Sequence, residues 1–130
     1  MTAKGKSDIR LGRLELEIMN AVWDRGDATV QQVKDALAPR RKRAYSTILT
    51  MMRKLEEKGF LEHETQGRAY VYRAKVPRRE VRRGLLGQLV DRLFDGSPGL
   101  LVTSLVEEEM IDGEELREIE RLIRKGGKEK

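Results

Sequence analysis

The sequence predicts a mostly α-helical fold with a small β-hairpin: a winged helix-turn-helix followed by a helical dimerisation region. Helical patterns of apolar residues recur along the chain, and a glycine-tipped pair of strand-like segments interrupts them at residues 60–74. The helix before this hairpin follows a run of four cations at residues 40–43. A helix, a hairpin and dense positive charge in sequence indicate double-stranded DNA as the partner.

The amino-acid composition limits the classes of protein to which this chain can belong. With 130 residues, 38% of them charged and 5% aromatic, the chain has room for one compact domain with an appendage. The absence of Cys excludes disulfides and thiolate metal sites. No apolar run approaches the ~20 residues of a membrane helix, and residues 1–10 lack the apolar core of a signal peptide. We therefore expect a cytoplasmic protein without membrane insertion.

Charge is divided unevenly along the chain. Residues 1–83 carry 20 Lys and Arg against 11 Asp and Glu, a net charge of +9, whereas residues 84–130 carry 7 against 11, a net charge of −4. This asymmetry predicts that the first part faces a polyanion and that the second part does not.

The first two helices form the support of the predicted DNA-binding domain. Leu14 and Ile18 belong to an apolar stripe with spacings of three and four, which predicts a helix over residues 11–24. The second helix is expected to begin at Thr29, because Thr29 and Gln32 have the spacing of a capping box.

The third helix, expected over residues 44–58, is the candidate recognition helix. Ile48, Met52 and Leu55 cluster on one side of the helical wheel and predict its buried face. The opposite side is small and hydroxylic, with cations toward one end, and such a face fits a major groove about 12 Å wide. The side chains on it are Ser46, Thr47, Thr50, Arg53 and Lys54.

The predicted hairpin is the wing. Its strands cover residues 60–65 and 69–74, and Gly67 supplies the positive φ that a tight turn needs. Arg68 then lies at the tip, within reach of a phosphate or the minor groove. His63 is the only histidine and, without Cys or a second His, is interpreted as a surface strand residue.

Three further amphipathic helices are expected from Pro77, Pro98 and Asp112. Their apolar stripes are wider than one copy of the chain is expected to cover, which favours a two-fold dimer; an extension folded back on its own domain is the alternative. The expected divisions are residues 9–76 and 77–125, with disordered tails at 1–8 and 126–130. The candidate dimer residues are Leu85, Leu86, Leu89, Leu93, Leu101, Leu105, Ile119 and Leu122.

Over approximately residues 9–125 the chain resembles the BlaI/MecI penicillinase-repressor family, which includes the copper-responsive CopY repressors. The resemblance lies in the order and spacing of several short motifs. These are Leu14-Glu15, Met19 and Trp23, then Thr29-Val30-x-x-Val33, Tyr45-Ser46-Thr47, Leu55-x-x-Lys58-Gly59, Gly67-Arg68 and Tyr70-x-Tyr72.

The resemblance implies a homodimeric repressor that binds an inverted repeat, often built on TACA/TGTA half-sites, without a cofactor. The third helix would read the major groove, which adds Tyr45 to the contact candidates, and Arg68 would belong to the wing. Phosphate contacts are expected mainly from the basic residues before and after this helix. They are Arg40, Arg41, Lys42, Arg43 and Arg68, with Arg13 as a further candidate.

Two departures from the family bear on regulation. The copper branch carries a Cys-rich metal motif, and this chain has no Cys, so copper sensing is excluded. In the β-lactam branch a membrane metalloprotease antirepressor is the implied partner, and proteolysis at an Asn-Phe bond releases the repressor. The aligned position here is Ser104-Leu105, a small residue followed by an apolar one.

A protein-interaction module and an enzyme are the two alternatives to a repressor. A winged helix can serve as a protein-interaction module without sequence-specific DNA binding, although the hydroxylic face of the third helix argues against this. An enzyme is disfavoured because the chain has one His, no Cys and no Gly-rich phosphate loop. The consecutive acids Glu107, Glu108 and Glu109 point in different directions on a helix and are expected to be solvated.

Overall fold

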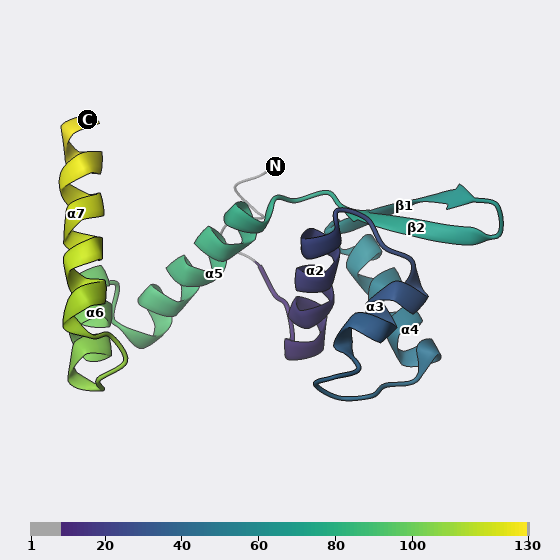
Figure 1. The fold of residues 1–130 in the computed structure, drawn as a ribbon, viewed down its shortest axis with the longest axis horizontal. Coiled ribbons are helices and arrows are strands. Elements are labelled where there is room, and N and C mark those ends of the chain that lie inside the picture. The colour runs from purple at the N-terminus through teal and green to yellow at the C-terminus, as the bar shows by residue number, and fades with distance from the viewer. Residues whose placement is uncertain (1–8, 130) are drawn as a thin grey trace. The chain divides into compact units, whose positions relative to one another are not determined.

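A computed structural model describes residues 9–129, with side chains described to residue 126. These residues form six helices and one two-stranded antiparallel sheet (Figure 1), which confirms the predicted mostly α fold with a small hairpin. The expected tail at residues 1–8 lies outside the described part. In chain order the elements are α2 (Arg13–Arg25), α3 (Val30–Leu37), α4 (Tyr45–Glu57), β1 (Leu61–Gln66), β2 (Ala69–Ala74), α5 (Arg78–Leu93), α6 (Pro98–Glu107) and α7 (Gly113–Glu129).

The chain divides into two compact units, one up to Leu85 and one from Leu86 onward. The division falls inside α5, whereas the sequence placed a domain boundary between residues 76 and 77. That boundary stays a prediction about which part folds independently.

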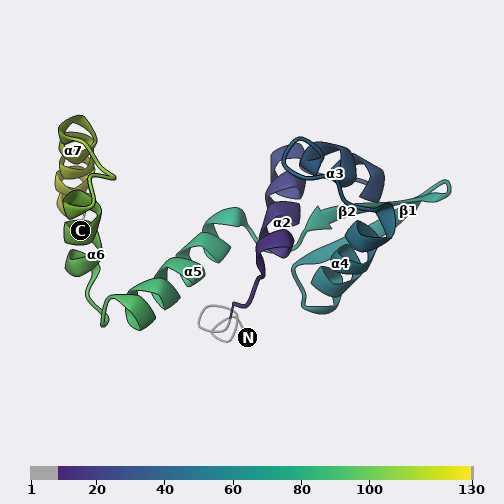
Figure 2. The same cartoon turned by 90° about the horizontal axis from the view of Figure 1, so that it is seen from below.

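In the first unit, α2, α3 and α4 pack around a shared apolar core, and both views show the three helices together with the hairpin extending from them (Figures 1 and 2). Ile18 and Met19 of α2 meet Ile48, Met52 and Leu55 of α4 in this core, and all five side chains are fully buried. The apolar stripes read from the sequence are therefore the faces that the helices bury.

The hairpin is joined to the helical core by a short additional pairing. Strand β1 pairs antiparallel with β2 from Leu61 opposite Ala74 to Gln66 opposite Ala69, which leaves Gly67 and Arg68 as a two-residue loop. Ala28, just before α3, exchanges two backbone hydrogen bonds with Tyr72 of β2 at 2.8 and 2.9 Å. Because Tyr72 is also fully buried, the base of the wing is fixed while its tip extends into solvent.

The beginning of α5 is anchored to the first unit. Trp23 packs against the core, as its place on the α2 stripe predicted, and its ring nitrogen donates a hydrogen bond to the carbonyl of Val76 at 3.0 Å. Arg78 donates to a carboxylate oxygen of Asp24 at 2.6 Å and to the carbonyl of Asn20 at 3.1 Å.

In the second unit, α6 and α7 begin at side-chain caps. Ser97 accepts a hydrogen bond from the backbone of Leu100 at 3.0 Å, and Asp112 and Glu115 form a reciprocal capping box at 2.8 and 3.0 Å. Helix α7 continues to Glu129, whereas the sequence predicted a disordered tail from residue 126. Its extension past the two glycines at 126 and 127 is the clearest departure from the predicted boundaries.

Candidate nucleic-acid interface

Helix α4 has two chemically distinct faces. Ile48, Met52 and Leu55 are fully buried, Leu49 and Met51 are partly buried against the same core, and the polar face opposite them is exposed along the helix. All of the predicted contact residues on this helix are exposed: Tyr45, Ser46, Thr47, Thr50, Arg53 and Lys54. A helix that presents hydroxyls and cations while its other face is locked in the core can lie in a major groove without losing its packing.

The loop before α4 carries the basic run, but its four cations are not equivalent. Arg41 and Lys42 are exposed, as residues that contact phosphates need to be. Arg43 lies instead against α2, where its guanidinium is 3.3 Å from a carboxylate oxygen of Glu17. Arg40 lies 3.8 Å from the same carboxylate and stays largely exposed. The sequence contained no signal for this division, because Glu17 is more than twenty residues away.

The wing presents Arg68 at its tip. Gly67, the first residue of the two-residue loop, has a φ of 61°, a value that glycine adopts without the steric cost of a side chain. Arg68 follows it and is exposed. The predicted position of this arginine, at the end of a hairpin that follows the α4 helix, is therefore the one observed.

His63 has more contacts than a surface strand residue would need. Its Nδ1 lies 2.8 and 2.9 Å from the two carboxylate oxygens of Glu56 on α4. Its ring stacks on Tyr70 of β2, with ring centroids 4.1 Å apart. His63 therefore connects α4 to both strands of the wing and fixes one relative to the other.

A second contact fixes the same, C-terminal end of α4, this time to α2. Lys58, the residue after the helix, lies 2.9 Å from a carboxylate oxygen of Glu15 on α2, and the backbone N–H of Gly12 donates to Glu15 at 2.8 Å. Burial alone would raise the pKa of Glu15, but the hydrogen bond from Gly12 and the charge of Lys58 outweigh it and lower this pKa below its usual value.

The lowered pKa predicts a loss of stability in acid. Because the folded chain binds this proton more weakly than the unfolded chain, Glu15 stabilises the fold above its unfolded pKa, and the contribution disappears as the pH falls through the folded pKa. We expect Glu15→Gln to lower the free energy of unfolding by about 1–3 kcal/mol at pH 7 and by much less near pH 3. Urea denaturation at both pH values measures this difference.

The matched control is Glu62→Gln, at an exposed carboxylate of β1 that forms no ion pair among residues 9–126. Its expected effect is within about 0.5 kcal/mol at either pH. Equal losses for the two variants at pH 7 would contradict the assigned role of Glu15.

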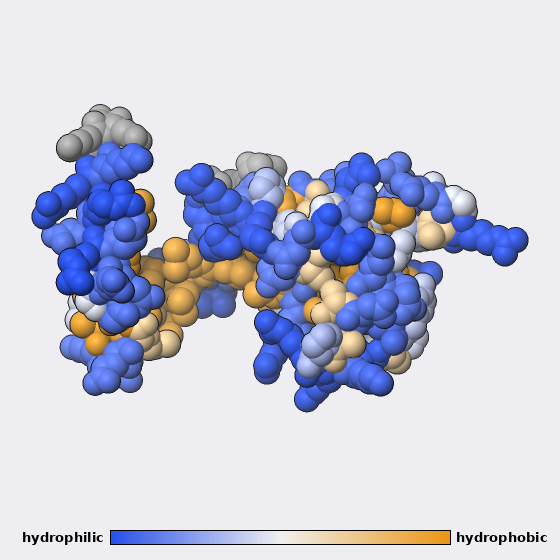
Figure 3. Space-filling view, in the orientation of Figure 1, coloured by the Kyte–Doolittle hydropathy of each residue, from blue (hydrophilic) through white to orange (hydrophobic). Residues whose placement is uncertain are grey.

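Helix α5 and the second unit expose apolar side chains as well as charged ones. Figure 3 shows apolar surface along α5 and around α6. Helix α6 buries none of its residues. The eight predicted dimer residues are all exposed or only partly buried: Leu85, Leu86, Leu89, Leu93, Leu101, Leu105, Ile119 and Leu122. Such a concentration of exposed leucine is expected of a surface that another chain covers.

Other chemistry has little support in the described part of the chain. Among these residues no group of three or more His, Cys, Asp or Glu side chains is placed to hold a metal ion. Within the same range no helix combines the length and the apolarity of a membrane span.

Comparison with known proteins identifies the family. The family model described as penicillinase repressor matches residues 11–125. The chain belongs to the penicillinase repressor family. It is therefore a DNA-binding repressor by family and not an enzyme.

Two relatives and one solved structure show the extent of the similarity. The penicillinase repressor of Bacillus licheniformis is 26% identical over 109 residues, which cover 84% of this chain and 85% of that protein. The transcriptional regulator BlaI of Mycobacterium tuberculosis is 37% identical over 78 residues, 59% of this chain and 56% of its own. A MarR variant from E. coli, solved with operator DNA, is 16% identical, covers 91% of this chain and 75% of its own, and has a TM-score of 0.52. The MarR similarity supports the fold alone.

The resemblance predicted from the short motifs is confirmed, and so is the winged-helix fold. The individual DNA contacts and dimer contacts stay predictions, which the experiments below address.

Proposed function

We propose that this penicillinase repressor family member is a homodimeric, sequence-specific repressor that recognises an inverted-repeat operator. The observation that carries the proposal is the two-faced helix α4, with Ile48, Met52 and Leu55 fully buried and its hydroxyl and cationic side exposed. Under this proposal the chain acts in the cytoplasm by occupying a promoter.

Helix α4 would lie in the major groove. The hydroxyls of Ser46, Thr47 and Thr50 are suited to base edges or phosphates, and Arg53 is suited to the two acceptors of guanine. Arg41 and Lys42 before the helix, and Arg68 on the wing, would neutralise phosphates on either side of the groove. The base contacts supply specificity, and the phosphate contacts supply affinity and fix the register.

A two-fold dimer explains both the exposed leucines and the inverted repeat. The symmetry axis of a dimer relates two recognition helices in the same way as an inverted repeat relates its half-sites. The surface available for this contact includes Leu86 and Leu89 on α5 and Leu122 on α7, each of which is exposed in the single chain.

Proteolysis near Ser104 and Leu105 is the proposed route of release, with a membrane metalloprotease antirepressor as the partner. Both residues lie within α6 and are partly buried. A protease requires local opening of this helix, and in the single chain α6 buries none of its own residues, so opening is expected to cost little wherever the dimer does not cover Leu105. Cutting there would separate parts of the proposed dimer surface.

Fluorescence anisotropy with a TACA/TGTA inverted-repeat duplex and a scrambled duplex tests the proposal, each at low and near-physiological salt. We expect binding to the repeat that persists at the higher salt and binding to the scrambled duplex that is lost, because counterion release dominates non-specific affinity.

Equal, salt-sensitive binding to both duplexes would contradict recognition of this repeat, and selection from random DNA would then identify the operator. Absence of binding to either duplex would favour the protein-interaction module instead.

A further inference from the structure

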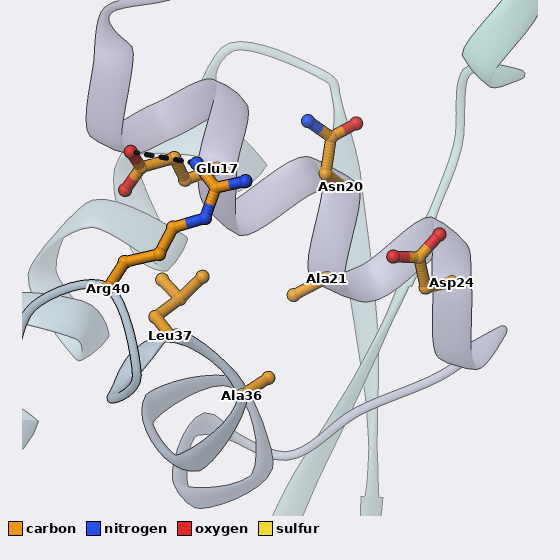
Figure 4. A pocket seen from close by; sticks show the side chains of 7 residues that line it. All are labelled: Glu17, Asn20, Ala21, Asp24, Ala36, Leu37 and Arg40. Carbon is orange, nitrogen blue, oxygen red and sulfur yellow. Dashed lines mark ion pairs between the residues drawn. The ribbon is translucent and has the colours of Figure 1, made fainter.

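Glu17 of α2 lies among three arginines outside the exposed face of α4. Its carboxylate oxygens are 3.3 Å from Nη1 of Arg43, 3.6 Å from Nε of Arg13 and 3.8 Å from Nη1 of Arg40. Figure 4 shows Glu17 and Arg40 facing each other at a shallow pocket of about 160 Å³ beside α2 and α3. The carboxylate therefore joins α2 to the loop that carries the basic run.

The three ion pairs of Glu17 differ in how deeply their side chains are buried. The side chains of Glu17 and Arg43 are 12% and 16% exposed, whereas those of Arg40 and Arg13 are 74% and 92% exposed. Exposed pairs are screened by water and contribute little, while a pair removed from water interacts more strongly. Of the three arginines, Arg43 therefore interacts most strongly with Glu17.

The Glu17 and Arg43 charges depend on each other for compensation. Oε1 of Glu17 and Nη1 of Arg43 are both buried, and neither atom has a hydrogen-bond partner within the described part of the chain. A buried charge without its counter-charge is unfavourable. Arg43 is therefore held against α2 as long as Glu17 carries its negative charge.

This pair lies where α4 begins. Arg43 is two residues before Tyr45, the first residue of α4, and the intervening N-cap, Ala44, has an extended backbone and forms no side-chain cap. The contact between Glu17 and Arg43 therefore joins the segment that enters α4 to α2.

The ion pair between Glu17 and Arg43 gives the cations of residues 40–43 different roles. Arg41 and Lys42 are exposed, and neither forms an ion pair within residues 9–126. Arg43 has its charge compensated inside the domain. Fewer than four of the cations at residues 40–43 are therefore available to neutralise phosphates.

We propose that Glu17 is a positioning residue of the DNA interface. By holding Arg43 against α2, it fixes the start of α4 and withholds this arginine from DNA phosphates, so that Arg41 and Lys42 make the phosphate contacts of the loop. The inference rests on the proposed function, because it requires that α4 and its preceding loop bind DNA.

The test measures how the affinity of each variant of the 130-residue chain for the two duplexes described above depends on salt concentration. Log affinity falls as log salt rises, and each phosphate contact adds about 0.9 to the magnitude of this negative slope; every change of slope given for a variant is a change of that magnitude. Arg41→Gln is expected to reduce the slope by about 0.9, whereas Arg43→Gln leaves it nearly unchanged. Glu17→Gln frees Arg43, so the slope rises by up to about 0.9 and the ratio of specific to non-specific affinity falls. Adding Arg43→Gln to Glu17→Gln removes the increase in slope.

Two controls separate positioning from a general effect on folding. Glu17→Asp retains the carboxylate and is expected to keep a slope closer to that of the unchanged chain. Thermal denaturation of every variant shows whether it is folded; if Glu17→Gln is not, the comparison of Arg43→Gln with Arg41→Gln decides.

Equal reductions of slope by Arg43→Gln and Arg41→Gln would overturn the inference, because Arg43 would then contact phosphate directly. A folded Glu17→Gln variant with unchanged slope and unchanged specificity would also overturn it. Failure of the proposed function looks different: the unchanged chain would bind repeat and scrambled duplexes equally, and the slopes could still be compared on either one.

Discussion

Replacing Thr50 and Arg53 together with alanine is expected to weaken binding to the inverted repeat by about 100-fold, since each good base contact contributes roughly 1–3 kcal/mol of discrimination. Both side chains lie on the exposed face of α4, while Ile48, Met52 and Leu55 hold the opposite face in the core. The substitution therefore removes groups that we propose face the groove without removing any that support the helix. Anisotropy titrations at constant salt measure the change.

Binding to the scrambled duplex distinguishes base reading from general electrostatics. The double substitution removes one positive charge, so non-specific affinity is expected to fall by no more than the loss of a single phosphate contact allows. Glu57→Ala, on the last turn of the same helix and also exposed, is the matched control and is expected to leave specific binding nearly unchanged. Equal losses on the repeat and on the scrambled duplex would refute the assigned role of the α4 face.

The elements of the fold were predictable because their signals are local. Apolar spacing in α4 identified Ile48, Met52 and Leu55, all of which are fully buried. The capping box of Thr29 and Gln32 forms as predicted, with hydrogen bonds of 2.9 and 3.1 Å. Gly67 has the positive φ that a tight hairpin needs. Each of these features depends on residues within a few positions of one another.

The supports of the candidate site were not predictable in the same way. The partner of Arg43 is Glu17 and that of Lys58 is Glu15, residues that lie far apart in sequence and meet only when α2 packs beside α4. Periodicity shows which face of a helix is buried, but it does not show which charged groups meet at the edge of the buried face. The sequence alone therefore gives no sign that the α2 carboxylates are the partners of these cations.

The same limit explains the position of His63. Its sequence context indicated a strand and excluded a metal site, but the contact with Glu56 depends on how the wing folds back along α4. A single-sequence pattern contains the candidate DNA-reading residues, while the groups that hold them in place appear only with the tertiary structure.

Introducing a charge into the exposed apolar surface of the second unit is expected to separate the proposed dimer. Leu89 on α5 and Leu122 on α7 are 42% and 53% exposed in the single chain, so an aspartate at either position stays hydrated in the monomer and loses its hydration only when a second chain covers it. We expect Leu89→Asp and Leu122→Asp to be folded and monomeric, as measured by circular dichroism and sedimentation velocity.

Loss of the dimer should weaken binding to the full operator far more than binding to one half-site. Two linked DNA-binding units gain about 10²–10⁴ in affinity when the second unit binds within the same complex, and a monomer lacks this gain although its α4 face is unchanged. Arg117→Asp introduces the same side chain at an exposed position of α7 outside its apolar stripe and should leave both the dimer and operator binding intact. A stable dimer that persists with both leucines replaced would show that the two chains meet through another surface.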